Sequence, residues 1–274
     1  MKKHLTTILL VLIFLIGLSV LLYPTVADYV NAKHQSRAIA NYVEGLADID
    51  PVDYSAYIEE ARRYNEGLAG NTARFSPSEE EIEAYHGYLG ADNSVIGYVE
   101  IPAIGVDLPM YLGTEESVLQ VGIGCMPGSS LPIGGLGTHA VLTGHRGLPS
   151  ARLLTDLDQV VVGDIFTVFT LNETLTYRVD QIRIVLPTEL SDLAIDPEQD
   201  YCTLVTCTPY GINTHRMLVR GHRIDNIVEE EVKTYRVTSD AIQIEPMLVA
   251  VFTAIPILLV LGAVVMFGGG KKRR

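Results

Sequence analysis

One cysteine lies where a predicted strand gives way to a loop. The run 203–206 is β-branched and apolar, whereas 209–211 consists of turn residues, so Cys207 is expected to end a strand. An apolar run resumes at 217–219, which predicts a short hairpin that brings Arg216 alongside Cys207. A thiol at a strand end beside a guanidinium is a setting for chemistry, because nearby positive charge favours the thiolate.

A histidine occupies the same kind of position. His145 follows a predicted strand at 139–143 and opens a loop that contains glycine and proline. Attack on an amide needs a thiolate, and His145 can then protonate the departing amine. The permanently charged Arg216 can donate fixed hydrogen bonds to an oxyanion. These residue types indicate nucleophilic catalysis by Cys207, His145 and Arg216, but their spacing alone neither establishes nor excludes it.

The elements that must position these residues form a mainly β region at 95–226. Short β-branched runs are separated there by Gly, Pro or Asp turns. Strands are expected at 96–101, 106–111, 139–143, 164–169, 175–179, 182–185, 201–206 and 217–220. This count and spacing predict a closed or nearly closed eight-stranded β-barrel.

The region 24–94 is predicted to be helical, because Ala, Glu, Tyr and Arg recur at three- and four-residue spacing. A new helix is expected to start with Ser76 as its cap and Pro77 in its first turn. A loop at 67–75 precedes that start.

Two uncharged stretches, 5–22 and 246–267, predict membrane spans. Basic residues precede the first and follow the second, so both chain ends are expected in the cytoplasm and 23–245 outside. Segment 1–23 would be an N-terminal anchor or a signal peptide, and no clear small-x-small cleavage site follows it. Segment 227–245 would be a charged tether, and 246–274 a C-terminal transmembrane helix with a basic tail.

The charge balance limits the classes of partner. The chain has 20 basic and 33 acidic residues, a net charge of −13. Six of the basic residues lie in the two terminal flanks, which leaves 14 against 33, or −19, on the exterior part. This balance argues against nucleic acid and anionic lipid as partners. It is compatible with a basic substrate, although an acidic surface that serves solubility explains it as well.

The chain has three cysteines, Cys125, Cys202 and Cys207, so at least one thiol stays unpaired. Cys202 is an odd number of residues from Cys207, which predicts that it points to the opposite face of the strand and into the core. No Cys or His cluster has zinc spacing, so neither a metal nor another cofactor is predicted.

Several motifs resemble a known family when they are taken together. Thr203-Leu204-Val205-Thr206-Cys207, with Arg216 downstream and Thr143-Gly144-His145 upstream, is similar to the signature of sortases. The runs 105–109, 128–132, 143–151 and 206–211 resemble the class C, pilin-polymerising branch. The resemblance extends over about 98–223, nearly the whole predicted barrel, and the motifs occur in order.

The resemblance implies a cysteine transpeptidase on the surface of a Gram-positive bacterium. Cys207 would attack the Thr–Gly bond of an LPXTG-like sorting signal, and a lysine amine of the next pilin subunit would resolve the thioester. His145 would act as acid and base, and Arg216 would clamp the oxyanion or the substrate. Expected partners are therefore pilin subunits, the acceptor lysine amine and the membrane.

One feature departs from the class C pattern. Class C sortases commonly carry a lid with an Asp-Pro-aromatic motif before the barrel, and this sequence lacks that motif. Arg74-Phe75-Ser76-Pro77 is the nearest candidate, with Phe75 and Pro77 as possible lid residues; an ordinary loop or helix cap is the alternative.

Other functions stay open from the sequence. A housekeeping sortase would transfer its substrate to a cell-wall amine instead of a pilin lysine. A wall-anchored structural protein would carry a sorting pentapeptide before its C-terminal hydrophobic segment, and 243–247 does not match one. An inactive scaffolding barrel would not need Cys207, His145 and Arg216 together.

Overall fold

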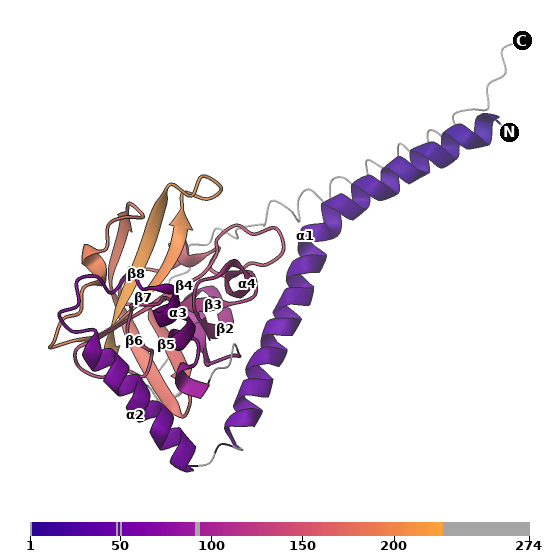
Figure 1. Ribbon diagram of the computed structural model, residues 1–274. Helices are drawn as coiled ribbons and strands as arrows, with labels where there is room; N and C mark the ends of the chain where they lie inside the picture. The colour runs from indigo at the N-terminus through magenta and orange to yellow at the C-terminus, as the bar shows by residue number, and fades with distance from the viewer. Residues whose placement is uncertain (1, 48, 50, 91–93, 227–274) are drawn as a thin grey trace, which may run out of the picture. The chain divides into compact units, whose positions relative to one another are not determined.

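The computed structural model describes residues 2–47, 49, 51–90 and 94–226 (Figure 1). The described residues fall into two compact units, 2–26 and 27–226. The predicted tether at 227–245 and the predicted second span at 246–267 lie outside the described residues.

Helix α1 (Lys2–Leu46) continues through Pro24, so the expected boundary at residue 23 is not a break in the helix. On its first half, the apolar side chains of Leu12, Ile16 and Val20 are 52%, 59% and 69% exposed. Among the described residues, α1 is long and apolar enough to cross a membrane by length and composition.

Three short helical elements follow before the barrel: α2 (Pro51–Gly67), α3 (Glu79–Tyr85) and the 3₁₀ helix η1 (Tyr88–Gly90). Helix α3 begins later than expected. Ser78 is its cap, because the Ser78 hydroxyl accepts from the Glu81 amide while the Glu81 carboxylate accepts from the Ser78 amide. Ser76 instead closes the preceding turn, where its amide donates to Ala73 at 2.8 Å.

Eight strands form a closed barrel in the order β1-β2-β3-β4-β7-β8-β6-β5, which confirms the predicted fold class (Figure 1). The strands are β1 (Gly97–Ile101), β2 (Val106–Leu112), β3 (Ile123–Cys125), β4 (Thr138–Thr143), β5 (Ile165–Thr170), β6 (Glu173–Val185), β7 (Asp200–Thr208) and β8 (His215–Ile224). The short helical elements between them are η2 (Pro102–Ile104), α4 (Glu116–Leu119), η3 (Leu157–Gln159) and η4 (Ser191–Leu193).

Two of the eight strands differ from the expectation. The three-residue strand β3 was not predicted, because it is too short to show an alternating pattern. The runs 175–179 and 182–185 are one strand, β6, whose register against β8 shifts between Val179 and Gln181. Asp180 lies at that irregularity and binds Arg220 at 2.9 Å, so it belongs to a bulge and not to a turn.

Strands β4 and β7 pair in parallel and are buried on both faces. One face contributes to the main hydrophobic core, through side chains such as Ala140, Leu142 and Leu204. The opposite face carries a second cluster, which consists of Val141, Val185, Leu193, Val205 and Leu218, with Phe75 and Met126 packed against it. Continuous apolar runs in β4 and β7 follow from this double burial.

Candidate active site

The hairpin of β7 and β8 brings Cys207 and Arg216 together. They are paired residues in its antiparallel register. Directly opposed side chains in such a pair have Cβ atoms roughly 4.5–5.5 Å apart. Cys207 is partly exposed, and the Arg216 guanidinium donates to the carbonyl oxygens of Asn213 and His215 at 3.2 and 3.1 Å. The register thus places Arg216 opposite Cys207 near the end of β7, as the hairpin pattern predicted.

His145 lies just beyond the end of β4, which pairs with β7 through Thr143 and Val205. The connection continues past this pair. The Gly144 amide donates to the Val205 carbonyl at 3.0 Å, and the Thr206 hydroxyl donates to the Gly144 carbonyl at 2.8 Å. These bonds place His145 and Cys207 at the same end of two adjacent strands.

The imidazole of His145 has an acidic neighbour that the sequence reasoning did not identify. Its Nε2 lies 3.3 Å from a carboxylate oxygen of Glu116, at the start of α4. Hydrogen bonds from Gln120 and from His145 lower the pKa of Glu116 below its ordinary value. Glu116 is 65% exposed, so the contribution of this pair to stability is small.

A second histidine, His139, is buried and neutral. It lies on β4, on the face that carries the second cluster. Nδ1 of His139 lies 2.8 Å from the Ala194 carbonyl, and Nε2 lies 2.7 Å from the Thr203 hydroxyl. A neutral ring satisfies both contacts if Nδ1–H donates and Nε2 accepts. Burial lowers the pKa of His139 to about 4, with Arg74 and Arg220 contributing in the same direction.

The predicted lid residues lie close to this face. Phe75 packs against the second cluster, which includes Val205, two residues before Cys207 on the same face of β7. Arg74 holds the loop there by donating to the carbonyl oxygens of Gly128 at 2.9 Å and Leu193 at 2.5 Å. Pro77 is partly buried and precedes α3.

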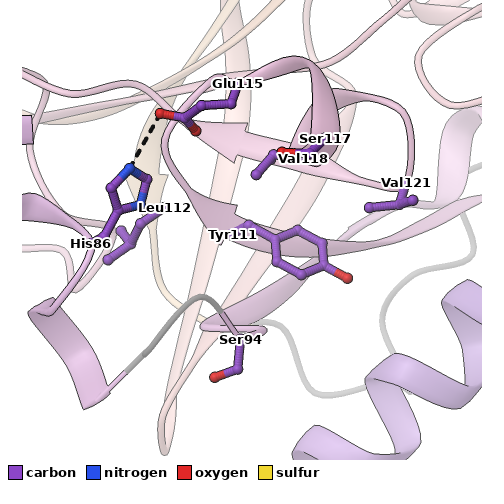
Figure 2. Close-up of a pocket in the computed structure, with 8 residues that line it drawn as sticks. All are labelled: His86, Ser94, Tyr111, Leu112, Glu115, Ser117, Val118 and Val121. Atoms are coloured by element: carbon purple, nitrogen blue, oxygen red, sulfur yellow. Dashed lines mark hydrogen bonds and ion pairs between the residues drawn. The ribbon is translucent and has the colours of Figure 1, made fainter. Parts of the chain in front are cut away.

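A pocket of about 420 Å³ lies between β2 and α4 (Figure 2). Figure 2 shows the ion pair of His86 and Glu115, at 3.2 Å, at one end of the pocket and the Tyr111 ring along its wall. Cys207, His145 and Arg216 are not among the residues that line it. Among the described residues, no group of three or more His, Cys, Asp or Glu side chains is arranged to hold a metal ion.

The contacts of Arg146, which follows His145, are also not predicted by the sequence. Arg146 lies in the run 143–151, but no local pattern predicts which side chain its guanidinium contacts. In the structure it binds Asp158 and lies 3.5 Å from the Thr208 hydroxyl.

Comparisons with known proteins point to one family. The model of the sortase domain matches residues 99–224. Sortase D of Bacillus subtilis is 28% identical over 131 residues, a match that covers 47% of this chain and 63% of that relative, so less than two thirds of the relative is spanned.

Solved structures are more similar. Sortase C1 of Streptococcus agalactiae is 51% identical, with a TM-score of 0.67, and the match covers 70% of this chain and all of that one. Sortase C of Clostridium perfringens, solved with the C-terminal cell wall sorting motif, is 39% identical, with a TM-score of 0.62 and the same coverage. The chain therefore belongs to the sortase family, a family of cysteine transpeptidases, and the solved structures that it resembles are class C sortases.

Proposed function

We propose that the chain is a membrane-anchored cysteine transpeptidase that assembles covalent pili. It cleaves an LPXTG-like sorting signal between Thr and Gly through a thioester at Cys207, and it transfers the acyl group to a lysine amine of a pilin subunit. The observation that carries the proposal is the register of β7 and β8, which pairs Cys207 with Arg216, beside the β4 end that leads into His145.

The proposed reaction has two acyl transfers. The Cys207 thiolate attacks the Thr carbonyl carbon, Arg216 hydrogen bonds stabilise the oxyanion, and the C–N bond to Gly breaks as His145 protonates the departing amine. The lysine amine then attacks the thioester, the C–S bond breaks, and His145 accepts the proton that the amine loses. The products are an isopeptide bond and the regenerated enzyme.

The lid is part of the proposal. Phe75, in the loop at 68–78, packs on the second cluster, which lies on the face of β4 and β7 that also carries Cys207. Because an extended sorting peptide has to reach the thiol, we infer that the loop moves away when substrate binds. Its departure would break the Arg74 bonds to Gly128 and Leu193.

Helix α1 supplies a candidate anchor at the N-terminal end. The C. perfringens relative was solved with a cell wall sorting motif, which supports a peptide of that chemistry as substrate. The catalytic barrel would lie outside the cell, where both pilin subunits and the sorting signals of their neighbours are accessible.

The test uses the full-length chain in detergent with LPXTG-type peptides and intact-mass spectrometry. The wild type should gain the mass of the acyl fragment at Cys207, whereas Cys207→Ala should gain none. His145→Ala and Arg216→Ala should reduce the rate of adduct formation by roughly 10²- to 10⁴-fold. A wild type without an adduct, or a Cys207→Ala variant with the same adduct, would overturn the catalytic proposal.

A second comparison separates pilin polymerisation from cell-wall anchoring. The preformed thioester is offered either a pilin domain with its acceptor lysine or a cell-wall stem peptide amine. Faster resolution by the pilin lysine is expected, and preference for the stem peptide would support a housekeeping sortase instead.

A further inference from the structure

Arg146 is a charged residue that is buried although it follows directly after a partly exposed histidine. Its side chain is only 9% exposed. The guanidinium binds the carboxylate of Asp158 in η3, and Nη1 lies 3.5 Å from the Thr208 hydroxyl. It therefore connects the loop after β4 with two other segments of the chain.

Arg146 makes two contacts at or just after the end of β7, with Thr208 and Tyr210. Thr208 directly follows Cys207 and is itself buried. The Arg146 guanidinium carbon also lies 5.9 Å from the centre of the Tyr210 ring. Gly147 packs against the same ring, because a Cβ at this position would come within 2.9 Å of a ring carbon, and its φ of +80° is one that glycine adopts without strain.

Stability does not explain this buried charge. Nε of Arg146 is buried without a hydrogen-bond partner among the described residues. A buried donor without a partner lowers the stability of the folded state, and buried ion pairs are often replaceable by apolar side chains of similar size at no loss. The contacts of Arg146 are thus better explained by positioning of neighbouring segments than by a contribution to folding stability.

We propose that Arg146 is a positioning residue, which ties the loop carrying His145 to the strand end carrying Cys207. The inference rests on the proposed function and deepens it. Acid, base and nucleophile must stay within a narrow geometry, and a displacement of about 1 Å can reduce turnover by roughly 10²-fold. Arg146 limits that displacement by holding Thr208 and Tyr210 against the loop after β4, while Asp158 fixes the guanidinium itself.

The test compares four single variants and one double variant of the full-length chain in detergent, with an LPXTG-type peptide and an amine acceptor. Arg146→Met removes the charge and keeps the length, Arg146→Lys keeps the charge, and Asp158→Asn breaks the ion pair at its exposed end. Arg152→Met is the matched control. Arg152 forms an ion pair with Asp156 in the same loop region but is 54% exposed. For each variant, kcat, KM and the melting temperature are measured.

Arg146→Met is expected to lower kcat roughly 10- to 100-fold, with KM and the melting temperature near the wild-type values. Arg146→Lys should not restore kcat, because an ammonium cannot contact Asp158, Thr208 and the Tyr210 ring at once. Asp158→Asn should lower kcat, and the double variant with Arg146→Met should lose no more than Arg146→Met alone. Arg152→Met should match the wild type.

If the wild type is active, two results would overturn the positioning role of Arg146 and leave the proposed function standing. One is wild-type kcat in Arg146→Met and in Asp158→Asn. The other is a loss of kcat in both variants that is accompanied by a lower melting temperature, together with wild-type kcat and melting temperature in Arg146→Lys. That result would show that Arg146 acts through stability. A wild type that forms no thioester at Cys207 overturns the proposed function and this inference with it.

Discussion

At the residue scale, the three cysteines differ in their burial. Cys125 and Cys202 are fully buried, whereas Cys207 is partly exposed. Burial raises the pKa of the Cys125 thiol to about 11 and that of Cys202 well above its ordinary value. Both thiols therefore stay protonated at neutral pH, and Cys207 is the thiol available for reaction.

We predict that a thiol reagent labels one cysteine in the native protein and three after unfolding. The native adduct should map to Cys207 by peptide mass spectrometry. Cys207→Ala, as the control, should take up no label until it is unfolded. Native labelling at Cys125 or Cys202 would show that these side chains are reachable, contrary to their burial.

At the element scale, strand β4 carries a histidine, His139, whose protonation opposes folding. Because the pKa of His139 is lowered from 6.5 to about 4, the unfolded chain binds the proton more tightly than the folded chain. The stability that the neutral ring contributes is thus present above pH 6.5 and is lost as the pH falls towards 4. Among charged groups, Arg74 and Arg220 lower the pKa of His139 further, whereas Asp180 raises it.

We predict that His139 makes the unfolding free energy fall by about 3 kcal/mol between pH 7 and pH 4. His139→Gln, which can still bond Thr203 or Ala194, should lack this component. Urea unfolding in detergent, followed by circular dichroism at several pH values, measures the difference between the two slopes. Equal slopes in wild type and variant would contradict the prediction.

The loop at 68–78, between α2 and α3, is the second element with a testable role. Phe75 packs on the second cluster. Removing its ring takes away about 1–2 kcal/mol of the burial free energy that holds the loop in its closed position. Phe75→Ala should therefore raise the rate of Cys207 acylation roughly five- to thirtyfold. Single-turnover mass spectrometry with an LPXTG-type peptide measures this rate.

Leu136→Ala is a suitable control for the Phe75 variant, because Leu136 is an apolar loop residue that is 77% exposed. Its acylation rate should equal that of the wild type. If Phe75→Ala acylates no faster than the wild type, the loop is not a lid in the proposed sense.

At the scale of the whole molecule, the basic flanks and α1 predict that the barrel lies outside the cell. A membrane-impermeant thiol reagent should label Cys207 in intact cells. In a Cys207→Ala background, Lys272→Cys should be labelled only after permeabilisation, because the basic tail is expected in the cytoplasm. Labelling of Cys207 that requires permeabilisation would reverse the proposed topology.

Much of the barrel follows from local patterns. The alternating and apolar runs predicted most strands, and the turn residues at 209–211 placed Cys207 at a strand end, because both signals act over a few neighbouring residues. Strand β3 and the bulge at Asp180 escaped detection. Strand β3 is stabilised by its pairing with β2 and β4, and the bulge by the ion pair of Asp180 with Arg220, which is 40 positions away in the sequence.

The sequence alone determined the family resemblance, the residue types at the candidate site, and the pairing of Cys207 with Arg216 across a short hairpin. Tertiary structure decided which side chains surround them. The parallel pairing of β4 with β7 brings His145 to the same end as Cys207, the loop after α2 places Phe75 on their shared face, and Arg146 reaches Thr208 across 62 positions of sequence. These contacts join residues far apart in the chain, so no local periodicity encodes them; they exist because the fold pairs β4 with β7 and packs the neighbouring loops against that pair.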